Sequence, residues 1–137
     1  MDLKTMLQNE EGLSLVPYRD HLGFLTVGWG HRTNSHSTIS LEEADRLLDE
    51  DIAKAEAGVR KALPWFDDMN EVRQAVLIAM AFQIGLRGLL VFKKTLRYVE
   101  RGSYVLAAHE MLDSRWAEQT PARAGRMSRM MLTGKWV

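Results

Sequence analysis

One stretch limits the fold of this chain more than any other, a helical pattern that runs from Leu41 to Leu63. Ser40 and Glu43 form a capping-box signature at its start, and Pro64 blocks its continuation. Its apolar side chains recur every third or fourth residue, at Leu41, Ala44, Leu48, Ile52, Ala55, Val59 and Leu63. A helix of this length measures roughly 30 Å. We therefore expect it to connect two lobes.

The segment before this helix starts helical and then becomes β-prone. The helical pattern is opened by Asp2, a good N-cap, and closed by Gly12. Two short β-prone pieces, 15–18 and 24–29, flank a turn at 20–23. The pattern predicts a short helix followed by a hairpin.

A third short strand is expected after Gly30. The next residues, 32–39, are polar and without periodicity, which is typical of an exposed loop.

Everything after Pro64 is predicted to be helical. The expected helices cover 71–84, 86–91, 93–101, 104–112 and 121–133. The first of them is strongly apolar and is our choice for the central core helix. The fold class is therefore α+β and mainly helical. A chain of 137 residues has room for a single domain, and its expected parts are a hairpin lobe (12–40), a connecting helix (41–63) and a helical lobe (64–137 with 1–11).

Composition excludes several classes of function. Eighteen basic and eighteen acidic side chains cancel, so no nucleic-acid partner is expected, although residues 71–137 carry eleven basic and five acidic groups. No cysteine is present, which rules out disulfides and thiolate metal sites. We expect no metal and no cofactor. Without a coiled-coil heptad or an exposed apolar seam, the chain is expected to be monomeric.

The N-terminus lacks the apolar core of a signal peptide, and no apolar run reaches the length of a membrane span. We therefore expect synthesis in the cytoplasm and no stable membrane insertion.

Two acids in unlike surroundings form the candidate catalytic pair. Glu11 ends the first helix against apolar residues, whereas Asp20 lies in a polar turn beside Arg19 and His21. By spacing alone, a structural role for both acids is the commoner outcome. Their different environments, however, are expected to keep one carboxyl protonated and the other ionised. Glycosidic bond cleavage needs such a division.

The same segment resembles the phage lysozyme family, the T-even type muramidase endolysins of glycoside hydrolase family 24. The residues that match the family's motif are Glu11, Gly12, Tyr18, Asp20, Gly23, Thr26, Gly28, Gly30 and His31. Residues 71–85 resemble the family's buried central helix, and 114–123 resemble its Ser-Arg-Trp-x-x-Gln-Thr-Pro-x-Arg segment. The resemblance covers nearly the whole chain and implies a lysozyme-like fold with the active site in the crevice between the lobes.

The resemblance also implies roles for residues. Glu11 would be the general acid, Asp20 the carboxylate that activates or stabilises, and Thr26 a hydroxyl that holds the attacking water. The residues expected to bind substrate are Gln83, Arg123, Phe82 and Gly30. The implied reaction is hydrolysis, with inversion, of the β-1,4 bond between N-acetylmuramic acid and N-acetylglucosamine in peptidoglycan. The implied setting is an endolysin of the host cytoplasm that needs a holin to reach the periplasmic wall.

Several of these residues have structural alternatives. His31 is expected to pair with Asp51 on the long helix rather than act as a base. Gln83 and Arg123 either line the cleft or cap local helices. Trp116 is expected, like Phe82, to belong to the core rather than to a sugar platform.

Two rival functions stay open at this stage. A lytic transglycosylase would cut the same bond without water, and a non-catalytic wall-binding or tail module would not cut it. The presence of Asp20 and Thr26 favours hydrolysis over both. The loop 32–39 is shorter than is usual in the family, so one wall of the substrate cleft is expected to be lower.

Overall fold

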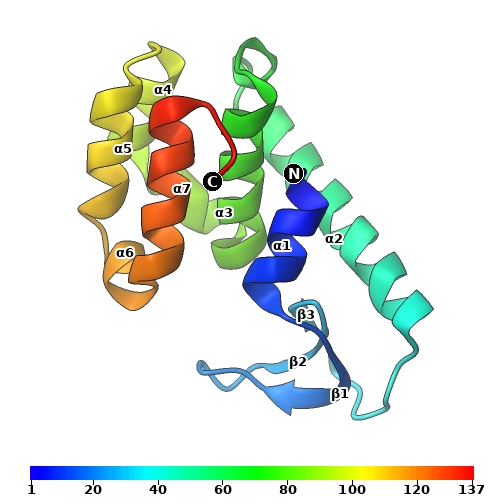
Figure 1. Cartoon of the computed structure of the whole chain (residues 1–137). Helices are drawn as coiled ribbons and strands as arrows, with labels where there is room; N and C mark the ends of the chain where they lie inside the picture. The colour runs from blue at the N-terminus through cyan, green and yellow to red at the C-terminus, as the bar shows by residue number, and fades with distance from the viewer. The chain divides into compact units, whose positions relative to one another are not determined.

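The computed structural model describes every residue from Met1 to Val137 and confirms the α+β class, with a small antiparallel sheet and a helical remainder. The chain divides into two compact units, Met1–Lys54 and Ala55–Val137 (Figure 1). The first helix falls in the first unit. Its predicted assignment to the helical lobe, within one domain of 137 residues, stays a prediction.

The first unit opens with helix α1, Leu3–Glu11. The Asp2 side chain caps it by accepting a hydrogen bond from the Thr5 N–H at 2.8 Å, and Gly12 ends it at a φ of 67°. These caps are the predicted ones. They make Glu11 the last residue of the helix, next to the chain's entry into the sheet.

The sheet has three antiparallel strands, β1 (Ser14–Arg19), β2 (Leu25–Gly28) and β3 (His31–Arg32), in that order. The predicted third strand is therefore present. Strand β1 is irregular between Ser14 and Tyr18, where four residue steps face two on β2. This bulge contains Pro17. Proline has no N–H to donate to a regular ladder, but a bulge interrupts the ladder and therefore tolerates it.

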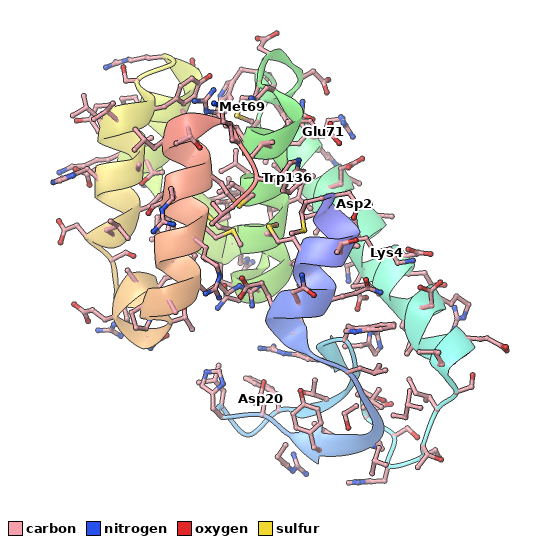
Figure 2. All side chains as sticks on the ribbon, viewed as in Figure 1. Asp2, Lys4, Asp20, Met69, Glu71 and Trp136 are labelled. Atoms are coloured by element: carbon pink, nitrogen blue, oxygen red, sulfur yellow. The ribbon has the colours of Figure 1, made fainter.

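Helix α2, Leu41–Ala62, is the predicted long helix. The Ser40 hydroxyl accepts a hydrogen bond from the Glu43 N–H at 3.1 Å, which is one half of the capping box. Within the first unit, Lys4 of α1 forms ion pairs with Asp45 and Asp49 of α2, at 2.7 and 2.8 Å (Figure 2). These two pairs join the helix that carries Glu11 to the start of α2.

The second unit is helical, as predicted. Its elements are η1 (Phe66–Asp68), α3 (Glu71–Leu90), α4 (Lys93–Glu100), α5 (Tyr104–Leu112), α6 (Arg115–Gln119) and α7 (Pro121–Thr133). Helix α7 contacts α3, α5 and α6, and Figure 1 shows it between α3 and α5. In α3, an unbroken run of side chains from Ala75 to Ala81 is buried.

Helix α3 contains a break at Gly85, which has a φ of 80° and a ψ of 160°. The break separates 71–84 from 86–90, as the sequence predicts. By length and composition α3 would suffice to cross a membrane, but half of its apolar window is buried inside the protein. That burial is typical of a core helix, so its hydropathy is weak evidence for a membrane span.

The apolar pattern of the sequence does not predict the bounds of two short elements of the second unit, η1 and α6. Each is too short to show an apolar period. The local sequence signal for α6 is its N-cap residue, Ser114. The Ser114 hydroxyl accepts a hydrogen bond from the Ala117 N–H at 3.1 Å.

Candidate active site

The carboxylate of Glu11 packs against the backbone of Gly30. A Cβ atom built on Gly30 would lie 2.8 Å from Oε2 of Glu11 and 3.0 Å from its Cδ. Gly30 also has a φ of +74°, a conformation that other residues rarely adopt. Two independent features, the positive φ and the close approach of Glu11, therefore require glycine at position 30. The Glu11 carboxyl occupies the space that a side chain at this position would fill.

Asp20 lies at the tip of the hairpin, where the turn folds back on its side chain (Figure 2). Its Oδ1 accepts hydrogen bonds from the N–H groups of Leu22 and Phe24, at 2.9 and 2.8 Å. Gly23, at a φ of 86°, closes the turn by donating its N–H to the Asp20 carbonyl at 2.9 Å. The turn thus fixes one carboxylate oxygen of Asp20.

This environment favours the ionised form of Asp20. Desolvation alone would raise the pKa of its carboxyl, but the hydrogen bonds from Phe24 and Leu22 outweigh it, together with the charges of His21 and Arg32. The net pKa of Asp20 is lower than its ordinary value. This half of the expected division between the two acids is therefore supported, and the protonation of Glu11 stays a prediction.

A titration of Asp20 by carbon-detected NMR is expected to give a pKa below the ordinary aspartate value of about 3.9. Because the folded-state pKa is the lower one, Asp20 contributes stability above its unfolded pKa and loses that contribution as pH falls through its folded pKa. A carboxyl that titrates at or above the ordinary value would contradict the arrangement of the turn.

Thr26 lies on β2 with only 4% of its surface exposed. Its hydroxyl donates a hydrogen bond to the Phe24 carbonyl at 2.9 Å, which leaves the oxygen lone pairs free to accept a hydrogen bond from another group. In the sheet, Thr26 lies directly opposite Tyr18 of β1 and Arg32 of β3. Directly paired residues project from the same face of a sheet, so these three side chains share one face.

Tyr18 is a further candidate residue of the site, one to which the motif assigns no role. Burial raises the pKa of its phenol, and the negative charges of Glu11 and Asp20 raise it further. The phenol therefore lies within the field of both acids. Its place in the family motif, two residues before Asp20, is the signal in the sequence that points to it.

His31 forms the expected pair with Asp51. Its Nδ1 lies 2.8 Å from Oδ2 of Asp51, and the pair links β3 to α2 within the first unit. Because the imidazole is used to attach β3 to α2, the contact favours a structural role for His31 over a role as a catalytic base.

The remaining predicted site residues belong to the second unit. Trp116 is 6% exposed and donates its indole N–H to Oε1 of Gln83 at 2.8 Å. Its ring packs edge to face with Phe92 at a centroid distance of 5.9 Å and borders a cavity of about 440 Å³. Phe82 and Arg123 are half-buried, on α3 and α7. Trp116 and Gln83 thus take part in the packing of their own unit.

No group of three or more histidine, aspartate or glutamate side chains in the chain is arranged to hold a metal ion. The candidate site in the first unit is made of two carboxylates, a hydroxyl and a phenol.

A small antiparallel sheet followed by a helical remainder agrees with a lysozyme-like fold. Residues 8–130 match the family model described as phage lysozyme. The chain belongs to this family and is a glycoside hydrolase of the lysozyme type.

Three curated relatives are covered over different shares of their own length. It is 28% identical to the probable T4-type lysozyme 1 of Dictyostelium discoideum, over 96% of this chain and 94% of that protein. It is 30% identical to the pre-baseplate central spike protein Gp5 of Enterobacteria phage T4, over 98% of this chain but 28% of that protein. It is also 30% identical to the endolysin of Bacillus phage B103, over 78% of this chain and 41% of that protein.

Proposed function

We propose that this protein hydrolyses the β-1,4 bond between N-acetylmuramic acid and N-acetylglucosamine in peptidoglycan by an inverting, two-carboxylate mechanism. The observation that carries the proposal is that Asp20, whose pKa is lowered, shares one face of the hairpin with the Thr26 hydroxyl. A second carboxylate, that of Glu11, packs against Gly30 at the end of the same hairpin.

In the proposed reaction Glu11 donates its proton to the glycosidic oxygen, and the bond to the anomeric carbon breaks. A water molecule attacks that carbon from the opposite face of the sugar and gives up a proton. Asp20 stabilises the positive charge that develops on the sugar and takes part in removing the proton from the water. Thr26 accepts a hydrogen bond from the same water and orients it.

Asp20→Asn is expected to fold normally and to clear a peptidoglycan suspension at least about 100-fold more slowly than the wild type, because the amide carries no charge to stabilise the transition state. The measurement is turbidity against outer-membrane-stripped cells, with circular dichroism as the check on folding. Clearing by Asp20→Asn at the wild-type rate would remove Asp20 from the mechanism.

We also propose the setting of an endolysin, a monomer that is made in the host cytoplasm and reaches the wall after a holin opens the membrane. The similarity to the B103 endolysin supports this setting. Expression without a holin is expected to leave cells intact, and co-expression with one is expected to lyse them. Lysis without a holin would count against it.

The similarity to Gp5 supports a second setting, in which the same activity belongs to a phage tail. Peptide mass spectrometry of purified virions separates the two. Stoichiometric presence of this chain in the particle would favour the tail, and its presence only in the soluble lysate would favour the endolysin.

A further inference from the structure

We propose that Phe24 and Arg32 form a substrate subsite that binds a carboxylate of the muramyl substituent on the peptidoglycan strand. The inference rests on the proposed function, because it places this subsite on the sheet face that carries Asp20 and Thr26.

The register of the sheet fixes the face. Thr26 lies directly opposite Arg32, so their side chains project from the same side. Phe24 precedes Thr26 by two residues and therefore shares that side. The Asp20 N–H donates to the Phe24 carbonyl at 2.9 Å, which continues the pairing of Arg19 with Leu25 by one residue. Asp20, Phe24, Thr26 and Arg32 thus lie on one face of the sheet.

Arg32 is held on this surface by stacking. Its guanidinium carbon lies 3.7 Å from the centroid of the Phe24 ring. A guanidinium stacked on an aromatic face keeps its N–H donors in the plane of the group, where they point away from the ring. The ring thereby orients the cation without using its hydrogen-bond donors.

These donors have no partner within the protein. Arg32 is exposed and forms no ion pair and no side-chain hydrogen bond, in contrast to Arg46 and Arg60, which are each paired with two acids. The nearest acid on the same face, Asp20, uses Oδ1 for two backbone N–H groups. A positioned, unpaired guanidinium beside a catalytic carboxylate is suited to bind an anion supplied by the substrate.

The chemistry of the substrate identifies that anion. The two sugars of the strand are neutral, and its negative charges are carboxylates carried by the muramyl substituent, either in the stem peptide or, where the peptide is missing, on the lactyl group. A guanidinium binds such a carboxylate through two parallel hydrogen bonds. Phe24 is 44% exposed, so its ring also offers apolar surface to the same substituent.

The test measures binding in a Glu11→Gln background, so that the outcome does not depend on hydrolysis. Co-sedimentation with insoluble peptidoglycan is compared for Arg32→Gln, Arg32→Lys and Phe24→Leu. The matched control is Arg129→Gln, which removes one exposed positive charge from α7. Arg32→Gln is expected to weaken binding about tenfold, as loss of a charge-assisted contact does, whereas Arg129→Gln leaves binding unchanged. Arg32→Lys is expected to lose part of the binding, because lysine lacks the two parallel donors of the guanidinium. Phe24→Leu is also expected to lose part of the binding, because it removes the ring on which the guanidinium stacks.

Two further ligands identify the anion. Neutral chitin oligosaccharides are expected to bind Arg32→Gln and its parent equally. Strands stripped of peptide by an amidase carry only the lactyl carboxylate, so a difference there assigns that group, and a difference confined to intact peptidoglycan assigns the stem peptide. An equal loss on chitin oligosaccharides, an equal loss with Arg129→Gln, or no loss at all would overturn the subsite. Failure of the wild type to cut peptidoglycan would instead overturn the proposed function.

Discussion

Glu11→Gln is expected to fold like the wild type and to lose activity by about 10²- to 10⁴-fold, the usual contribution of a general acid. The amide matches the carboxyl in size, so it fits the space beside Gly30 that the carboxyl occupies. It cannot deliver a proton to the glycosidic oxygen. The measurement is the initial rate of clearing of a peptidoglycan suspension, with thermal unfolding as the check on stability.

Glu42→Gln is the matched control for this experiment. Glu42 is an exposed acid in the first turn of α2, and no interaction of its side chain is seen. The same chemical change there is expected to leave the clearing rate unchanged. A Glu11→Gln protein that clears the suspension as fast as Glu42→Gln would remove Glu11 from the mechanism.

Gly30→Ala is expected to have the second largest effect, because it acts on Glu11 through packing. The added methyl would lie 2.8 Å from Oε2 of Glu11, closer than such atoms approach, so the carboxyl must move. A misplacement of about 1 Å can reduce the rate about 100-fold. The positive φ of Gly30 adds backbone strain of roughly 1–2 kcal/mol. Clearing rate and thermal unfolding are measured together.

Gly102→Ala separates these two effects. Gly102 has a φ of 73°, nearly that of Gly30, but nothing lies within 4 Å of where its Cβ would be. It should therefore show similar backbone strain and full activity. If Gly30→Ala is as active as Gly102→Ala, the contact between Gly30 and Glu11 does not position the acid.

The sequence predicts those parts of the fold that short-range chemistry determines. Ser40 opens the long helix where its capping signature indicates, and Pro64 follows its end. The break at Gly85 and the caps of α1 are also local features, so they can be recognised without tertiary contacts. The bounds of η1 and α6 are not predicted, since helices this short leave no apolar period to detect.

The candidate site was predicted only in part, because its arrangement depends on strand register. The motif identifies Glu11, Asp20 and Thr26, but it does not show that Tyr18 and Arg32 pair with Thr26 across the sheet. The pairing of Tyr18 with Thr26 follows the bulge between Ser14 and Tyr18, which alternation along a strand cannot locate. The stack of Arg32 on Phe24 is a diagonal contact and equally invisible from one strand.

Mass spectrometry of the digested glycan tests hydrolysis of the muramyl bond most directly. Purified peptidoglycan is incubated with the wild-type protein, with Glu11→Gln as the blank, and the soluble fragments are reduced and weighed. We expect fragments that end in reducible N-acetylmuramic acid. Fragments that end in anhydromuramic acid, lighter by one water, would mean transglycosylation, and reducible N-acetylglucosamine ends would mean that the other bond is cut.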